Sequence, residues 1–97
     1  MKHASATALR QLAPLIKKLR ALPALVERTP GCFYHRSSGF LHFHEDPAGF
    51  FADAKLDFHI FKRYRVSTRA EQSALLKAVV GSLTRAQSTT RSKASSR

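Results

Sequence analysis

The chain has 97 residues and a formal net charge of +11, from 17 Lys and Arg residues against six Asp and Glu residues. Its length suits a single domain, and no apolar run approaches the roughly 18 residues that a membrane-spanning helix needs. The single cysteine, Cys32, excludes an internal disulfide framework and favours a reducing compartment, which we take to be the cytoplasm. The excess of positive charge favours acidic partners.

The first 26 residues contain no acid and carry an apolar pattern typical of a helix. Residues 1–7 are expected to be frayed, and an apolar stripe then recurs at spacings of three and four: Leu9, Leu12, Leu15, Ile16, Leu19, Leu22 and Val26. Pro14 either lies in the first turn of a helix that starts near Ala13 or kinks a longer one. A basic, acid-free start is also typical of a mitochondrial presequence, but the stripe runs on toward the rest of the fold.

The middle of the chain predicts a small antiparallel sheet, because short segments rich in aromatic and aliphatic residues alternate with turn residues. Thr29-Pro30-Gly31 is expected to be a turn. The predicted strands are Cys32–Ser37, Phe40–Glu45, Phe50–Leu56 and Phe58–Val66.

The clearest strand signal is a hairpin around Asp46-Pro47-Ala48-Gly49, because Asp, Pro and Gly suit the first, second and fourth positions of a turn. Pairing Asp46 with Gly49 places His42 opposite Asp53 and His44 opposite Phe51. One face of the hairpin is then apolar and faces the core: Leu41, Phe43, Phe50, Ala52, Ala54 and Leu56. The other face carries His42, His44, Phe51, Asp53, Lys55 and Asp57.

The last predicted element is a helix that opens with a capping box, Thr68-Arg69-Ala70-Glu71. Its expected buried stripe consists of Leu75, Leu76, Val79, Val80 and Leu83. Residues 86–97 are Ser-, Thr-, Arg- and Lys-rich, which predicts a disordered basic tail after a single domain of residues 1–85. The fold class is therefore α+β, with a sheet of three to four strands and the N- and C-terminal helices packed on one face.

Several short segments are shared with known proteins. They are Ala21-Leu22-Pro23-Ala24-Leu25 followed by Glu27, a Gly-containing turn, a Phe-Leu strand that ends in His-Glu-Asp, and a closing helix. In these the chain resembles small uncharacterised bacterial α+β proteins and, more distantly, YjbR-like proteins, a family described as having a DNA-binding-like fold. The resemblance spans roughly Ala21 to Leu76. It implies the α+β fold and supplies no catalytic signature.

One candidate site combines histidine with carboxylate. His42 and His44 share a strand face, Asp53 lies opposite, and His35 or His59 is expected to approach from a neighbouring strand. Two imidazoles and one carboxylate can hold zinc or another divalent ion, and a His–Asp pair can also act as a general base. The simpler interpretation is an exposed cross-strand pair that contributes about 0.2–1 kcal/mol.

The leading functional prediction is a basic binding module without a catalytic role or cofactor. Its partner would be nucleic acid or an acidic protein, held by Lys17, Lys18, Arg20, Lys62, Arg63, Arg65 and Arg69. Aromatic residues on the open sheet face, Phe51 and Phe61, could stack on bases, although the basic residues also fit a plain solvated surface. The alternatives are a metal-binding protein or small metal-dependent hydrolase that uses His42, His44 and Asp53, and a homodimer through the open sheet face.

Overall fold

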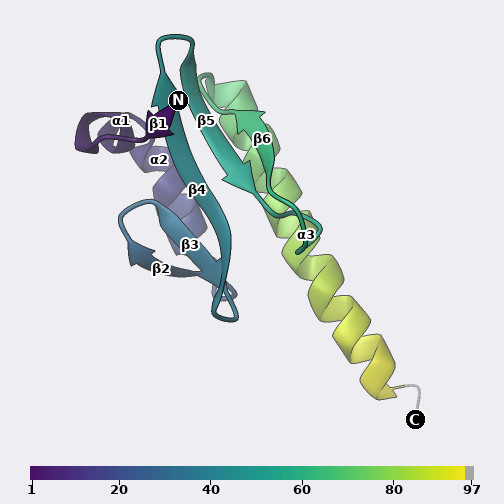
Figure 1. Ribbon diagram of the computed structural model, residues 1–97. Coiled ribbons are helices and arrows are strands. Elements are labelled where there is room, and N and C mark those ends of the chain that lie inside the picture. The colour runs from purple at the N-terminus through teal and green to yellow at the C-terminus, as the bar shows by residue number, and fades with distance from the viewer. Residues whose placement is uncertain (96–97) are drawn as a thin grey trace.

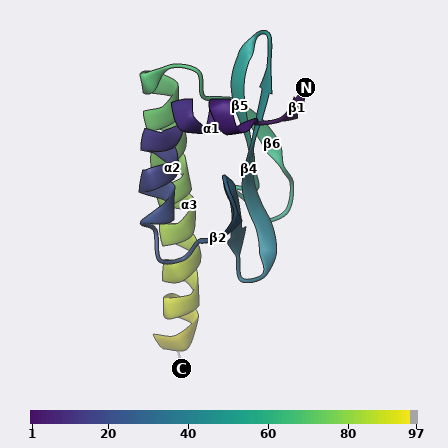
Figure 2. The same cartoon turned by 90° about the vertical axis from the view of Figure 1, so that its left-hand side faces the viewer.

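The computed structural model describes residues 1–95, with side chains described through residue 87. An antiparallel sheet forms one layer, and the helices cover one of its faces (Figures 1 and 2). The strands are β1 (Lys2–His3), β2 (Val26–Thr29), β3 (Cys32–His35), β4 (Ser38–Asp46), β5 (Gly49–Ala54) and β6 (Lys62–Arg65). The helices are α1 (Ala6–Gln11), α2 (Ala13–Arg20) and α3 (Arg69–Ser95).

The prediction of a three- to four-stranded sheet is wrong, because the sheet of the described chain has six strands. They run in the order β2-β3-β4-β5-β6, and β1 pairs with β4 beside them. The two strands that were not predicted are β1, in the segment expected to be frayed, and β2, where the end of a helix was expected. Both are short and mostly exposed, so neither has a buried face that would produce an apolar alternation in the sequence.

The predicted hairpin and its register are confirmed. Asp46 pairs with Gly49, His44 with Phe51 and His42 with Asp53, and the Asp46 carboxylate accepts a hydrogen bond from the Ala48 amide at 2.8 Å. The predicted core face is buried at Leu41, Phe43, Ala52 and Ala54, and Phe50 and Leu56 are partly buried beside it. The turn chemistry therefore sets which side chains reach the open face.

Phe40 is the one place where β4 departs from simple alternation. Phe33 pairs with Leu41 and Tyr34 with Gly39, so Phe40 is an extra residue in β4, as in a β-bulge. Consequently the adjacent side chains of Phe40 and Leu41 are both buried.

The predicted strand Phe58–Val66 is too long, since only Lys62–Arg65 joins the sheet. The Asp57 carboxylate accepts hydrogen bonds from the amides of His59 and Ile60 at 2.8 and 3.0 Å. This local bonding gives the backbone a turn in place of a sheet ladder, with Phe58 at a φ of 66°. As a result, Ile60 lies outside the sheet and is exposed.

The N-terminal stripe is divided into two helices at Leu12, which ends α1 and precedes α2. Pro14 lies in the first turn of α2, as one of the two alternatives predicted, because proline has no amide hydrogen to contribute further along a helix. Leu12, Leu15, Ile16 and Leu19 are buried, whereas Val26 lies in β2 and is exposed.

Helix α3 begins at the predicted capping box. The Glu71 amide donates to Thr68 Oγ1 at 3.1 Å, and the Thr68 amide donates to Glu71 Oε1 at 2.9 Å. Leu75, Val79 and Leu83 are buried, while Leu76 is half-buried and Val80 exposed.

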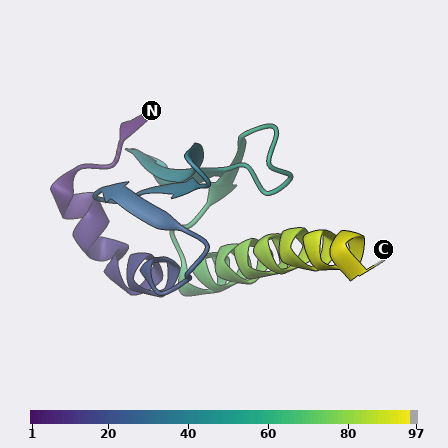
Figure 3. The ribbon, with the colours of Figure 1, turned by 90° about the horizontal axis from the view of Figure 1, so that it is seen from below.

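Helices α2 and α3 run side by side in the same direction on the sheet (Figure 2). Buried Ser82 of α3 donates to the carbonyl of Leu56, which ties the helix to the segment after β5. The helix then continues past the end of the sheet (Figure 3), through residues 86–95 of the segment for which disorder was predicted. Residues 96–97 of that segment lie outside the described residues.

Candidate functional site

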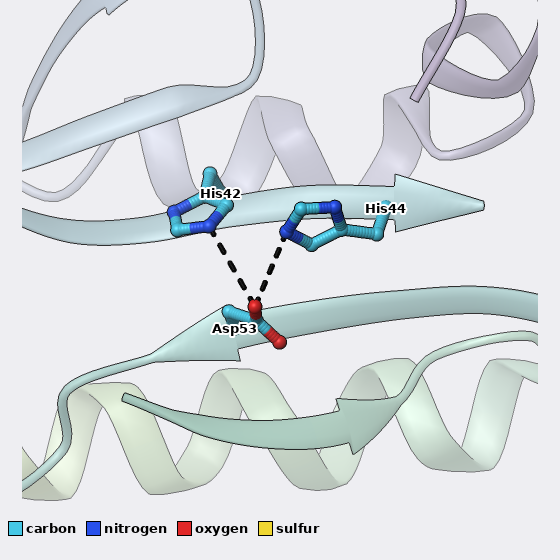
Figure 4. Close-up of side chains that lie close together, drawn as sticks. All are labelled: His42, His44 and Asp53. Carbon is cyan, nitrogen blue, oxygen red and sulfur yellow. Dashed lines mark ion pairs between the residues drawn. The ribbon is translucent and has the colours of Figure 1, made fainter. Parts of the chain in front are cut away.

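The histidine and carboxylate side chains meet on the face of the sheet opposite the helices. His42 and His44 extend from β4 toward Asp53 on β5 (Figure 4). The Nε2 atoms of His42 and His44 lie 3.7 and 3.2 Å from the same oxygen, Asp53 Oδ2. The three candidate metal-ligating residues are therefore brought together as predicted, with one ligand atom from each within 4.8 Å of the others.

Asp53 is held in place by Arg63, which lies directly opposite it on β6. Arg63 Nε donates to Asp53 Oδ1 at 2.8 Å and Nη2 donates to Oδ2 at 2.9 Å. These hydrogen bonds are the main reason that the pKa of Asp53 lies below its ordinary value. The carboxylate is therefore ionised at neutral pH and oriented toward the two imidazoles.

The third imidazole of the cluster comes from His3, a residue that sequence reasoning did not assign to the site. Strand β1 pairs His3 with His44, and the two rings stack with centroids 4.9 Å apart. His35 and His59, which were expected near the site, lie elsewhere: His35 packs on Phe58, and the backbone of His59 belongs to the Asp57 turn.

His44 is the most enclosed ligand candidate, with its side chain 12% exposed. Both of its ring nitrogens are buried, and neither has a hydrogen-bond partner in the described structure. Nε2 is close to Asp53 Oδ2 but is not aligned for a hydrogen bond. A buried polar atom without a partner is costly, so this imidazole is a position where a bound ligand would gain free energy.

His42 is more exposed than His44, and its pKa is lowered. Burial, followed by the neighbouring His44, lowers its pKa below the ordinary imidazole value of 6.5, although Asp53 acts in the opposite direction. Phe61 packs edge-on against His42 at 5.1 Å between ring centroids, and the Lys55 ammonium lies 5.1 Å from the Phe61 ring centre. The ring of Phe61 is thus engaged with its neighbours while remaining 41% exposed.

Three of the seven predicted polyanion-binding residues are used within the fold. Arg20 forms an ion pair with Glu27, Arg63 with Asp53, and Arg65 with Glu71 at 3.3 Å. An arginine that is paired with a carboxylate has less net charge to offer a polyanion. Among the described residues, the remaining four have no ion pair and are exposed: Lys17, Lys18, Lys62 and Arg69.

Two of these four residues meet at one groove. Lys18 of α2 and Arg69 of α3 line a cavity of about 510 Å³ between the two helices, together with the polar side chains of Gln11, Gln72 and Ser73. No acidic residue of the described chain lines this cavity. Helix α3 begins at Arg69, so the partial positive charge of its N-terminus adds to the charge of the side chains.

Comparison with known proteins assigns the chain to no family. No protein-family model, curated protein or solved structure matches it. The resemblance to YjbR-like proteins therefore stays a prediction, as does the homodimer through the open sheet face. Among the described residues, no helix combines the length and the apolar character required to cross a bilayer.

Proposed function

We propose that this chain is a small basic binding module for a polyanion, with nucleic acid as the ligand class. The observation that carries the proposal is the groove between α2 and α3, which Lys18 and Arg69 both line and which no acidic residue of the described chain lines. The formal charge of +11 extends the attraction beyond the groove.

The groove has the chemistry that a phosphodiester requires. Lys18 and Arg69 supply charge, and Arg69 can bind two phosphate oxygens at once through its planar guanidinium. Ser73 adds a hydroxyl at the rim, whereas the Gln72 amide already donates to the Val66 carbonyl at 3.0 Å. The cavity volume of about 510 Å³ lies within the range of small-molecule sites.

Such contacts carry little sequence information, because phosphates are the same along any strand. We therefore propose binding without strong sequence preference. Lys17, on the same helix as Lys18, extends the basic surface of α2. The proposal places the protein in the cytoplasm, where the free thiol of Cys32 would remain reduced.

The experiment is a titration of a fluorescein-labelled single-stranded oligonucleotide, followed by fluorescence anisotropy at several salt concentrations. Neutralising Z phosphates gives a slope of log K against log salt of about −0.7Z for single strands. We expect binding at low salt that weakens steeply toward physiological salt. Absence of binding at low salt would refute the proposed function. Binding to polyglutamate but not to the oligonucleotide would instead identify an acidic protein as the partner class.

A further inference from the structure

We propose that His42, His44 and Asp53 form a binding site for one divalent transition-metal ion, with Zn²⁺ as the best-fitting ion. This site is separate from the groove between α2 and α3, because its residues belong to β4 and β5 and none of them lines the groove. The inference stands independently of polyanion binding.

Two of the three ligand–ligand distances are close to those of a tetrahedral centre, and all three ligand atoms lie within 4.8 Å of one another. When metal–ligand bonds are about 2.0–2.1 Å long, two ligand atoms of a tetrahedral site lie about 3.3 Å apart. The Nε2 atoms of His44 and His42 lie 3.2 and 3.7 Å from Asp53 Oδ2. Rotation of the half-buried His42 ring toward Asp53 would shorten the longer of these distances, and two regular strands in register hold the backbone of all three residues.

The two unpartnered nitrogens of His44 are a second, independent indication of a ligand. Nε2 and Nδ1 are both buried and make no hydrogen bond in the described structure. A metal ion bound at Nε2 would satisfy the nitrogen that faces Asp53. It would also replace an imidazole–carboxylate contact that lacks hydrogen-bond geometry by two direct bonds to the ion.

The hydrogen bonds from Arg63 leave Asp53 able to bind a metal ion, and they hold its carboxylate in position. It occupies one lone pair on each carboxylate oxygen of Asp53, and a carboxylate offers about four such positions. Oδ2 therefore keeps a lone pair for the ion. The Arg63 guanidinium fixes the orientation of the Asp53 carboxylate, as hydrogen-bond partners of metal ligands commonly do.

Two further aromatic rings contact the imidazoles of the site. His3 stacks on His44, and Phe61 packs against His42. The three protein ligands leave a fourth position for water, as in open zinc sites. Imidazole and carboxylate ligands suit zinc and other borderline divalent ions better than they suit calcium or magnesium.

The test is isothermal titration calorimetry of ZnCl₂ into metal-free protein at neutral pH, with Co²⁺ as a second probe because tetrahedral Co²⁺ absorbs visible light. We expect one ion per chain. The His44→Ala and His42→Ala variants should each weaken Zn²⁺ binding by at least about tenfold. Far-UV circular dichroism checks that they fold, and His42→Ala, at the more exposed position, provides the test if His44→Ala does not.

The matched controls are His35→Ala and His59→Ala, which remove imidazoles that lie outside the cluster. Both should bind Zn²⁺ as the unaltered chain does. Absence of stoichiometric Zn²⁺ binding would overturn the proposal. So would equal loss of affinity in the His59→Ala and His42→Ala variants, because the ion would then be held by scattered histidines rather than by this site.

Discussion

Arg63 on β6 holds the Asp53 carboxylate on β5 with two parallel hydrogen bonds of 2.8 and 2.9 Å. The two residues are direct partners in the sheet register, so the pair joins the edge strand to the hairpin. It also determines which way the carboxylate faces, and hence how His42 and His44 meet it. The geometry of the histidine cluster therefore depends on a residue that does not belong to it.

Replacing Arg63 by Met should lower stability at neutral pH and change its pH dependence. Arg63 lowers the pKa of Asp53, so its stabilisation is present above the ordinary value of 3.8 and is lost as pH falls through the lowered pKa. Urea unfolding should show a lower midpoint for Arg63→Met than for the unaltered chain at pH 7, and this difference should shrink as the pH falls below 3.8 and through the lowered pKa of Asp53. A difference that stays constant over the whole pH range would contradict the ion-pair explanation.

The imidazole of His42 should titrate below 6.5 in metal-free protein, because burial disfavours its charged form. The unfolded state then binds more protons than the folded state just below that pH, so stability rises with pH through this window. NMR titration of the ring carbons measures the pKa directly. In His42→Gln the dependence of stability on pH should be flatter there, and a His42 pKa above 6.5 would contradict the prediction.

The β3–β4 turn should be improved by glycine. Its two central residues, Arg36 and Ser37, have φ values of 52° and 72°, a left-handed conformation that suits Gly far better than other residues. Ser37→Gly should stabilise the fold by about 0.5–1 kcal/mol, measured by thermal unfolding. Ser38→Gly is the control, since Ser38 lies in β4 and should gain nothing. Destabilisation by Ser37→Gly would show that the turn is not strained.

Gly49 should not tolerate a side chain. It closes the β4–β5 turn at a φ of 138°, and an added Cβ would overlap Ser67 Oγ, which accepts a hydrogen bond from the Phe50 amide at 2.8 Å. Gly49→Ala should destabilise the fold by about 1–3 kcal/mol in urea unfolding. Gly39→Ala is the control, because a Cβ there has its nearest neighbour 3.8 Å away. Equal stability of the two variants would refute the argument.

The elements that could be predicted from the sequence have strong local signals. The Asp46-to-Gly49 turn and the alternation beside it determine the hairpin register, and Thr68 and Glu71 mark the start of α3. The register places His42, His44 and Asp53 on the same face of the hairpin, and Arg63 then orients the carboxylate. These features could be predicted because each depends on residues that are near neighbours in the chain or in one hairpin.

The parts that were missed depend on tertiary contacts or lack an apolar pattern. Strands β1 and β2 are short and exposed, so His3 could not be placed beside His44 from its neighbours in sequence. The groove brings together Lys18 and Arg69, which are separated in sequence by strands β2 to β6, and no local pattern relates two such distant residues. A strand was expected to begin at Phe58, but β6 begins only at Lys62. The reason is that the Asp57 side chain accepts hydrogen bonds from the backbone amides of His59 and Ile60.

The central claim is that Lys18 and Arg69 together bind phosphate in the groove. The most direct test is the salt dependence of oligonucleotide binding by the Lys18→Ala/Arg69→Ala double variant. The control is Arg10→Ala/Lys77→Ala, which removes the same charge from exposed positions outside the groove. If each lost phosphate contact reduces the slope by about 0.7, the double variant should show a slope shallower by about 1.4, while the control keeps the original slope. Equal slopes in the two double variants would contradict the account.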